Sequence, residues 1–381
     1  MADDYLWVDT EDALQSLCQE LRASDWLALD TEFMRERTYY PQFCLAQIAT
    51  PGVVACVDVL AIKSLEPLFG LLQNPDIVKV LHSARQDLEM FFHLSGRVPA
   101  PIFDTQLAAS FAGFPDQASY ASVVQTLLGV TLEKSHTRAD WSRRPLPAAV
   151  LQYAADDVRY LRDIYLRLKQ TIESQGRLNW LEAEKAVLTD PATYRPDPET
   201  AWQRLHGLQR FKSRQLAAAK ALAAWRERQA MSSNLPRQWI LKDEILTDLA
   251  RHLPTRLEEL APIRGLQEGL IRKYGDAWIA LMASAVGDAK PAPAPERLSA
   301  RDEALLDALM AVVRTKGSEA GVSPLQLATR RDLEQLVRGQ RNLDVLQGWR
   351  LETAGRALIE FMDGKSTLAV RDGLLIVHPD N

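Results

Sequence analysis

The 381-residue sequence is poor in cysteine and has no long apolar run. Its three cysteines, Cys18, Cys44 and Cys56, lack the spacing of metal ligands or redox pairs, so we expect buried thiols in a reducing compartment. No apolar segment is long enough to span a bilayer. The N-terminal stretch MADDYLWVDTED is acidic and lacks the basic-then-apolar order of a signal peptide. These absences predict a cytoplasmic protein that does not enter the membrane.

The sequence also lacks an overall positive charge. Its net charge of −5 argues against a uniformly basic nucleic-acid binder. The charge is uneven, however, because the stretch from Arg204 to Lys242 holds nine Lys or Arg and one Asp or Glu. This local excess of eight positive charges favours a nucleic-acid contact. The alternative is an amphipathic helix with a basic solvated face and its interleaved aromatics in the core.

Two proline-containing segments, DPATYRPDPE and GDAKPAPAPERLS, divide the chain. We predict three domains at 1–190, 201–286 and 299–375. The first is α/β with a mixed sheet, and the other two are small all-α domains that look like weak repeats. The last stretch, TLAVRDGLLIVHPDN, is either a hairpin around Asp372 and Gly373 or a tail.

Hydrophobic patterns predict the main elements. Apolar segments typical of strands lie at 26–30, 45–49, 53–57 and 77–81. In the first domain we expect helices at 64–72, with Ser64 as the N-cap, and at 103–111, capped by Asp104 or Thr105. A long helix at 146–175 has an apolar stripe. Further helices are expected at 201–207, 212–229, 242–252 and 266–285.

Two carboxylates follow the first buried strand, in the segment WLALDTEF. Side chains on a strand alternate between its faces, so Asp30 and Glu32 point the same way. Two neighbouring carboxylates repel each other unless a cation lies between them, and Mg²⁺ takes such oxygen ligands. The alternative is a strand end that runs into a polar loop.

Two further acids and a tyrosine lie in suitable places. Asp87 stands before the apolar stripe of a helix and near a strand end, where a helix cap is the alternative. Tyr153 and Asp157 are four residues apart on the long helix and share a face. Taken alone, Tyr153 could be a core aromatic residue. Asp157 taken alone could be a solvated acid on the surface. Together with Asp30 and Glu32 they give the order D-x-E, D, Y-x-x-x-D.

This order resembles the DEDD exonuclease superfamily, which has an RNase H-like (DnaQ-like) fold, and the tyrosine matches its tyrosine branch. The chain is similar to the ribonuclease D family in the segments DTEFMRERTYYPQFCLAQIA, HSARQDLEMF, FDTQLAASF, DWSRRPL and YAADDVRYL. The resemblance covers nearly the whole chain. It implies an exonuclease domain followed by two HRDC-type helical domains, of which the second is more divergent.

The resemblance also implies the chemistry. It predicts a 3′→5′ exoribonuclease that releases nucleoside 5′-monophosphates with two divalent ions, Mg²⁺ or Mn²⁺, about 4 Å apart. Asp30, Glu32 and Asp157 would bind the ion near the nucleophile, and Asp30, as a bridge, and Asp87 would bind the second. Tyr153 would orient the attacking water, because a phenol pKa near 10 suits orientation better than general-base catalysis. The expected substrates are RNAs, especially tRNA precursors. The expected state is a monomer, since no sustained heptad seam is present.

Other residues are weaker candidates for substrate contacts. Phe33 could stack on a terminal base or belong to the core. His82 could contact the substrate or be a structural histidine. The remaining candidates are basic side chains that phosphates would attract: His136, Arg143 and Arg144 before the long helix, and Arg210, Lys212 and Arg214 in the basic stretch. For these the alternative is solvated surface charge, and Arg144 beside Pro145 could brace its loop.

Two other functions remain open at this point. A DNA 3′→5′ exonuclease would use the same chemistry, and no residue identified so far reads a 2′-hydroxyl group. A non-catalytic RNA-binding adaptor would need none of the acids. The complete set of five residues argues against the adaptor.

Overall fold

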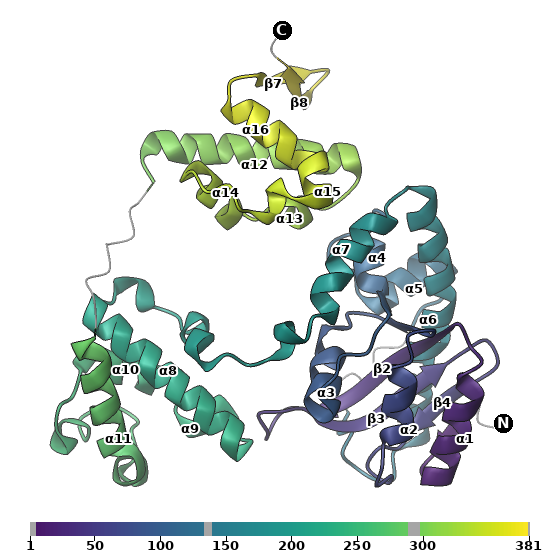
Figure 1. Ribbon diagram of the computed structural model, residues 1–381, viewed down its shortest axis with the longest axis horizontal. Coiled ribbons are helices and arrows are strands. Elements are labelled where there is room, and N and C mark those ends of the chain that lie inside the picture. The colour runs from purple at the N-terminus through teal and green to yellow at the C-terminus, as the bar shows by residue number, and fades with distance from the viewer. Residues whose placement is uncertain (1–4, 133–138, 289–297, 380–381) are drawn as a thin grey trace. The chain divides into compact units, whose positions relative to one another are not determined.

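The computed structural model describes residues 5–132, 139–288 and 298–379, which form two compact units. The first unit contains the described residues up to Glu32, then Phe43–Tyr194 and those from 298 onward. The second contains the short segment Phe33–Gln42 and the described residues from Arg195 to 288. Figure 1 shows the elements of both units.

A six-stranded mixed sheet lies at the centre of the first unit, in the order β1-β4-β3-β2-β5-β6. The parallel pairs are β1 with β4, β2 with β5, and β5 with β6, whereas β3 and β4 are antiparallel with Gln47 opposite Cys56. This confirms the predicted mixed sheet. The strands are β1 (Leu6–Val8), β2 (Trp26–Met34), β3 (Gln42–Ala49), β4 (Val54–Val57), β5 (Val78–Leu81) and β6 (Ile102–Asp104).

Seven α-helices accompany the sheet in the described residues before 190: α1 (Glu11–Leu21), α2 (Glu66–Leu72), α3 (Arg85–Ser95), α4 (Thr105–Phe111), α5 (Tyr120–Leu128), α6 (Ala148–Ser174) and α7 (Leu178–Thr189). The Asp104 carboxylate accepts from the backbone N–H groups of Gln106 and Leu107, so it caps α4 as predicted. The predicted Ser64 cap is wrong, because Leu65 precedes α2 and no side chain caps it. A proline in the first turn already reduces the number of N–H groups that need a cap there.

The long helix α6 carries two of the candidate site residues. Its apolar stripe, which includes Val150, Ala154, Val158 and Leu161, is buried as the 3.6-residue period predicts. This face packs on the sheet, where α6 contacts β4 and β5. Packing of the stripe fixes the rotation of α6, so the half-buried Tyr153 and Asp157 keep a defined direction.

The C-terminal block shares a core with the α/β domain that precedes it, which the sequence did not predict. The indole of Trp349 stacks on that of Trp180 in α7, with ring centroids 4.6 Å apart and planes at 19°. One hydrophobic cluster includes Phe111, Trp349 and Leu309. The block contains α12 (Ala300–Ala320), α13 (Pro324–Leu327), α14 (Arg330–Val337), α15 (Gly348–Arg350), the π-helical turn Leu351–Gly355 and α16 (Arg356–Met362).

The block ends in a hairpin. Strands β7 (Ser366–Arg371) and β8 (Leu374–Pro379) pair antiparallel, with Arg371 opposite Leu374. Asp372 and Gly373, at the turn, have φ angles of 50° and 77°. Both angles are positive, as a two-residue type I′ turn requires, and Asp-Gly is a favoured pair for it. The hairpin alternative is therefore confirmed.

The second unit is helical around its own core. It contains the 3₁₀-helix η2 (Pro198–Arg204) and the helices α8 (Ser213–Ser233), α9 (Arg237–Ile240), α10 (Asp243–His252) and α11 (Glu268–Gly287). The predicted helix at 201–207 is wrong in type and bounds, because it is a 3₁₀-helix that begins at Pro198. The core is built around Trp278, which is fully buried. Tyr39, from the segment Phe33–Gln42, packs here with Ala230 and Ile240.

None of the helices in the described part of the chain is long and apolar enough to cross a membrane.

Candidate active site

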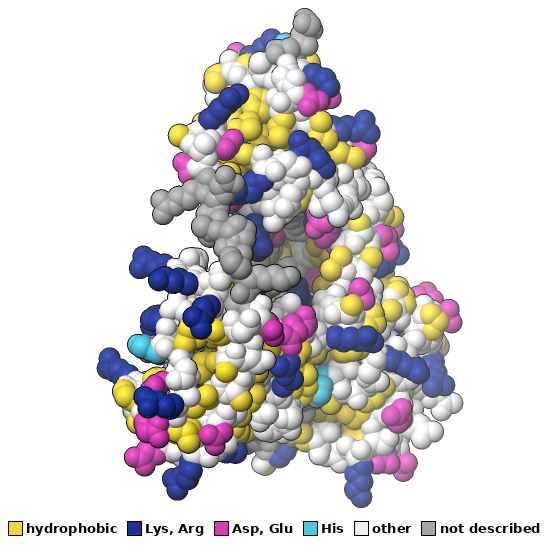
Figure 2. Space-filling model, turned by 60° about the vertical axis from the view of Figure 1, so that its left-hand side comes forward, with side chains coloured by type: hydrophobic (Ala, Val, Ile, Leu, Met, Phe, Trp, Pro, Cys, Tyr) yellow, Lys and Arg dark blue, Asp and Glu magenta, His cyan; other side chains and the backbone are white. Residues whose placement is uncertain are grey.

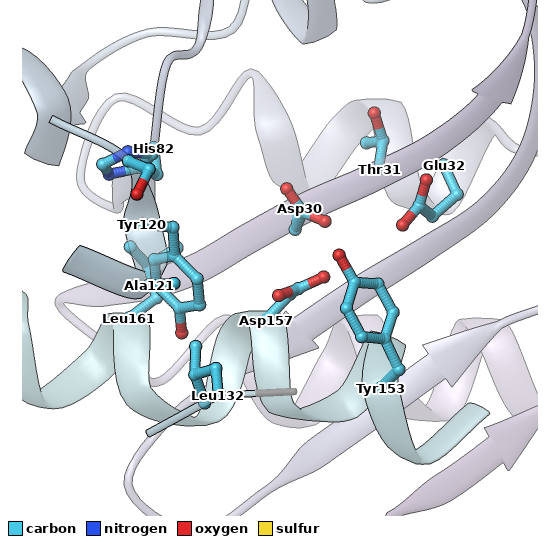
Figure 3. A pocket seen from close by; sticks show the side chains of 11 residues that line it. Asp30, Thr31, Glu32, His82, Tyr120, Ala121, Leu132, Tyr153, Asp157 and Leu161 are labelled. Carbon is cyan, nitrogen blue, oxygen red and sulfur yellow. The ribbon is translucent and has the colours of Figure 1, made fainter. Parts of the chain in front are cut away.

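Three carboxylates converge at one end of the sheet. Asp30 and Glu32 come from β2 and Asp157 comes from α6, and one carboxylate oxygen of each lies within 4.8 Å of the others. Figure 3 shows Asp30 and Asp157 facing each other, with Glu32 beside them. The structure thus brings together residues separated by more than 120 positions, as the motif order predicts.

The alternation of β2 explains why both of its acids join the cluster. Thr31, between them, points to the other face of the strand (Figure 3). Its hydroxyl donates to the carboxylate of Asp87, on α3. Asp87 is 7% exposed and lies outside the three-carboxylate cluster. Burial, and after it the charge of Asp30, raises the pKa of Asp87 well above its usual range, so charge connects Asp87 to the site.

The cluster holds its protons strongly. Burial, reinforced by the charge of Asp157, raises the pKa of Asp30 well above its usual range. Burial and then the charge of Asp30 raise the pKa of Glu32 to about 10. Burial raises the pKa of Asp157 to about 7, although a hydrogen bond from Tyr153 opposes this shift. Carboxylates that resist ionisation in the protein alone are those that a bound cation would stabilise most.

Tyr153 completes the site from the same face of α6. Its hydroxyl donates to the carboxylate of Asp157, one helical turn away, and points toward the acidic cluster in Figure 3. Burial and then the charge of Asp157 raise the pKa of Tyr153 above its ordinary value. The phenol therefore stays protonated near neutral pH and acts as a donor, which favours an orienting role over general-base catalysis.

The cluster opens into a pocket of about 360 Å³. Six of its lining residues were not among the site residues predicted from the sequence: Thr31, Ser119, Tyr120, Ala121, Leu132 and Leu161. The Tyr120 hydroxyl donates to the backbone oxygen of Asp156, with a distance of 3.0 Å, so the tyrosine is a fixed wall of the pocket. A tyrosine at the first position of a short helix has no local pattern that would reveal this role.

Asp156 is distinguished from Asp157 by its partners. Its carboxylate accepts from Arg159 Nε at 3.0 Å and from Gln152 Nε2 at 3.1 Å. Asp157 lines the pocket instead. The choice of Asp157 by its spacing from Tyr153 therefore agrees with the geometry.

Two of the weaker candidates are held by the protein. His82 lines the pocket, but its Nδ1 is 3.0 Å from the Thr105 hydroxyl and its Nε2 is 3.1 Å from the Ala118 oxygen. Arg144 donates to both carboxylate oxygens of Asp58 at 2.7 Å and to the Cys44 oxygen at 2.8 Å. These bonds favour the structural alternatives, a satisfied histidine and a loop brace, over substrate contacts.

The other weaker candidates lie away from the pocket walls or outside the described residues. Phe33 is half-buried at the end of β2 and is not among the residues that line the pocket. Arg143 is exposed. Arg210, Lys212 and Arg214 are exposed in the second unit. His136 lies outside the described residues.

The basic stretch is partly internal. Arg226 is 4% exposed and pairs with Asp243 at 2.6 Å, so it does not belong to a solvated basic face. The interleaved aromatics Trp202, Phe211 and Trp225 pack against the core of the second unit, as the amphipathic alternative expects. Figure 2 shows Lys and Arg side chains mixed with acidic and hydrophobic ones on one face of the molecule, with no continuous basic patch there.

The donor set fits a hard divalent cation. Carboxylate oxygens are the ligands that Mg²⁺ and Mn²⁺ prefer. Asp30, Glu32 and Asp157 meet within the reach of one ion, and burial is the main cause that raises the pKa of each, a cost of ionisation that a bound cation would offset. Asp87 is the fourth acid available beside them.

We expect Mg²⁺ or Mn²⁺ to raise the melting temperature, and to do so more at pH 8 than at pH 5. The folded pKa values of Glu32 and Asp157 lie above the unfolded values near 4. Without metal, the free energy of unfolding should therefore fall as the pH rises from about 4 towards 10. An ion at 100 times its dissociation constant would add about 2.7 kcal/mol. Thermal melts with metal and with chelator at both pH values test this. No shift in the melting temperature at saturating metal would contradict metal binding by the three carboxylates.

Comparisons with known proteins agree on one family. Residues 5–173 match the family model described as "3'-5' exonuclease", and residues 215–282 match that of the HRDC domain. Ribonuclease D of Acidiphilium cryptum is 43% identical, with 96% of this chain and 94% of the relative covered. Ribonuclease D of Gluconacetobacter diazotrophicus is 42% identical, with 97% and 95% covered.

Solved structures extend the similarity to the fold. The crystal structure of Escherichia coli RNase D, described as an exoribonuclease involved in structured RNA processing, is 35% identical and gives a TM-score of 0.83. It covers 95% of this chain, and 99% of the E. coli chain is matched. The catalytic core of RRP6 from Trypanosoma brucei gives a TM-score of 0.60 at 26% identity, with 76% of this chain and 81% of that chain covered. The chain therefore belongs to the ribonuclease D family of 3′→5′ exoribonucleases.

Proposed function

We propose that this chain hydrolyses RNA from its 3′ end with two divalent ions and releases nucleoside 5′-monophosphates. The observation that carries the proposal is the cluster of Asp30, Glu32 and Asp157, with the Tyr153 hydroxyl beside it, in one pocket. A strand end and a helix deliver these groups to the same place, and their shared burial disfavours their ionisation in the absence of a cation.

We assign different roles to the residues of the pocket. Asp30, Glu32 and Asp157 would hold one divalent ion, and Asp87 together with Asp30 would help to hold a second. Bound Mg²⁺ or Mn²⁺ would supply an activated water and would stabilise the leaving oxygen. Tyr153 donates a hydrogen bond and fixes the direction of its neighbours. Tyr120 and Leu132 form a wall of the pocket and exclude water from that side.

The proposed substrates are structured RNAs, and tRNA precursors in particular. The similarity to E. coli RNase D, an exoribonuclease involved in structured RNA processing, supports this choice. A 3′-extended tRNA precursor labelled at its 5′ end is the direct test. With Mg²⁺ or Mn²⁺ the RNA should shorten progressively from its 3′ end, and excess chelator should stop the reaction. Binding without shortening would favour the adaptor function instead.

A DNA exonuclease of the same chemistry is the second candidate. Matched RNA and DNA single strands of one sequence, assayed side by side, separate the two. We expect faster shortening of the RNA strand. A faster reaction on DNA would overturn the assignment of substrate while leaving the site and its metals intact.

We expect Tyr153→Phe to lower kcat by about 10², the usual effect of removing one positioned donor. KM should change little, because the hydroxyl contacts Asp157 and not a distant part of the substrate. The measurement is steady-state hydrolysis of a short RNA. Tyr160→Phe is the matched control, since Tyr160 lies on the same helix but does not line the pocket. Equal kcat values for the two variants would show that the Tyr153 hydroxyl has no role in the reaction.

We also propose that the enzyme works as a monomer in the cytoplasm. Its three cysteines are all unpaired and buried, which suits a reducing compartment. Sedimentation or light scattering of the full chain tests the monomer, and a dimer at working concentration would contradict it.

A further inference from the structure

Ser119 lines the active-site pocket, and the proposed mechanism does not use it. It stands at the N-cap position of α5, where its side-chain oxygen accepts a hydrogen bond from the backbone N–H of Ser122 at 3.3 Å. The backbone of Ser119 is extended, with φ −71° and ψ 151°, as is usual for an N-cap residue. The cap therefore holds the hydroxyl oxygen in one place in the pocket wall.

Ser119 is also held in place through its two neighbours in the chain. The backbone oxygen of Ala118 lies 3.1 Å from Nε2 of His82, which directly follows β5. The Tyr120 hydroxyl donates to the backbone oxygen of Asp156 on α6, and its ring contacts the His82 imidazole edge-on, with centroids 5.6 Å apart. The start of α5 is therefore fixed to α6 and to the end of β5, so Ser119 keeps a defined position in the pocket wall.

The hydroxyl group of Ser119 keeps its proton for a bound molecule. Among the described residues, four with a hydroxyl group line the pocket: Thr31, Ser119, Tyr120 and Tyr153. Three of these hydroxyls donate to the protein, two to carboxylates and one to a backbone oxygen. Ser119 accepts in its cap but donates to no acceptor in the described parts of the chain. A serine hydroxyl has one donor and two lone pairs, so one donor and one lone pair remain available.

The pocket walls beyond the carboxylates are suited to neutral groups. The described residues that line the pocket include no lysine or arginine, and both ring nitrogens of His82 already face protein oxygens. A phosphate would therefore be attracted to a cation held by the carboxylates and not to the other walls. Leu132, Leu161 and the ring of Tyr120 offer apolar surface to a base. Ser119 offers a neutral hydrogen-bonding group, which suits a hydroxyl group of a sugar.

The position of Ser119 in the pocket matches the place of a terminal sugar. Figure 3 shows His82 and Tyr120 on one side of the facing carboxylates of Asp30 and Asp157, and Ser119 directly precedes Tyr120 in the chain. In cleavage from a 3′ end, the scissile phosphate lies at the carboxylates and the terminal nucleotide occupies the space beyond them. The pocket, at about 360 Å³, is in the size range of sites that bind small ligands. The sugar of that nucleotide is joined directly to the scissile phosphate, so it is the first neutral group of the RNA beyond the carboxylates.

We propose that the Ser119 hydroxyl recognises the 2′-hydroxyl of the 3′-terminal ribose and so makes the enzyme prefer RNA to DNA. The inference rests on the proposed function, for which it names a specificity-determining residue. A 2′-hydroxyl both donates and accepts hydrogen bonds, and it is the group by which a protein distinguishes RNA from DNA at one nucleotide. The available donor and lone pair of Ser119 complement it. A 2′-deoxyribose leaves both of them without a partner from the substrate.

The test uses three oligoribonucleotides of one sequence that differ only in the last sugar: ribose, 2′-deoxyribose or 3′-deoxyribose. Release of the terminal nucleotide by the full chain is measured with Mg²⁺ in single turnover, below saturation. We expect the wild type to react about tenfold faster with the ribose end than with the 2′-deoxyribose end, the usual effect of one neutral hydrogen bond. In Ser119→Gly this ratio should fall to about one, because only the reaction of the ribose end loses a contact.

The variants are chosen to separate recognition from the helix cap. Glycine is well tolerated at an N-cap, so Ser119→Gly removes the hydroxyl while α5 keeps its start. Ser119→Thr should restore the preference for the ribose end, since threonine supplies a hydroxyl and also caps helices. Ser122→Ala is the matched control, because it removes a hydroxyl from the same helix at a residue that does not line the pocket. It should keep the ratio of the wild type.

Each other outcome overturns a defined part of the inference. If Ser119→Gly slows all three substrates equally, the ratio stays as in the wild type and the role of Ser119 is structural only. If the variant loses discrimination against the 3′-deoxyribose end alone, Ser119 reads the 3′-hydroxyl instead. A wild type that shortens RNA without any preference for the 2′-hydroxyl rejects the role of Ser119 and keeps the proposed function. A wild type that releases no nucleotide from any end with metal rejects the proposed function itself.

Discussion

Asp157→Asn is expected to lower the rate of RNA shortening by at least about 10³, or about 4 kcal/mol of transition-state stabilisation. The substitution keeps the size of the side chain and removes the charge from one of the three clustered carboxylates. It also replaces an acceptor of the Tyr153 hydrogen bond by a weaker, neutral one. The measurement is single-turnover shortening of a 3′-extended tRNA precursor, with Mg²⁺, with Mn²⁺ and with chelator.

The adjacent residue provides the control for this variant. Asp156→Asn makes the same chemical change one position away, where the carboxylate is bound by Arg159 and Gln152 outside the cluster. It should retain activity within about tenfold, since it alters only the surroundings of the site. If Asp157→Asn keeps its activity and Asp156→Asn loses it, the ligand has been misassigned. If both variants are fully active, the site lies elsewhere.

The second large effect concerns stability. Trp349→Ala should reduce the free energy of unfolding of the first unit by about 3–5 kcal/mol, the usual cost of truncating a buried aromatic. Trp349 is 5% exposed, stacks on Trp180 and contacts Phe111 edge-on with centroids 5.3 Å apart. Its indole N–H also donates to Glu184 at 3.2 Å. Denaturant unfolding followed by tryptophan fluorescence and by circular dichroism measures the loss.

Leu325→Ala is the control for the stability experiment. Leu325 lies in the same C-terminal block but is 64% exposed, so its truncation should change stability by less than about 0.5 kcal/mol. An equal, small effect of both variants would mean that the C-terminal block does not share a core with the first domain. The result also bears on truncation experiments, because deletion of the block would expose Trp180 and Phe111.

The directions of the candidate site residues were predictable because local periodicity determines them, whereas their assignment to a metal site came from the family resemblance. The two-residue period of a strand placed Asp30 and Glu32 on one face, and the four-residue spacing on a helix aligned Tyr153 with Asp157. The same holds for Asp104, since an acid before a helical pattern caps it through bonds to the following two or three residues. Each inference used interactions within four positions of the sequence.

Residues bound by distant partners were not predictable. Arg144 meets Asp58, which lies 86 positions earlier, and this pairing favours a loop brace over a phosphate contact. Arg226 was counted with a basic surface, but Asp243 and the core of the second unit bury it. The helix type at Pro198–Arg204 also differed, because short 3₁₀ segments have no distinctive hydrophobic period.

The joint core of α7 and the C-terminal block has a consequence for synthesis on the ribosome. Trp180 emerges long before its stacking partner Trp349 exists, and at about 5–20 residues per second the interval is about 10–30 s. During this time the apolar surface around Trp180 and Phe111 has no cover from the block that buries it in the finished chain. The nascent chain therefore exposes this surface until Trp349 has been added, and a ribosome that stalls within the second unit leaves a first domain whose apolar surface is uncovered.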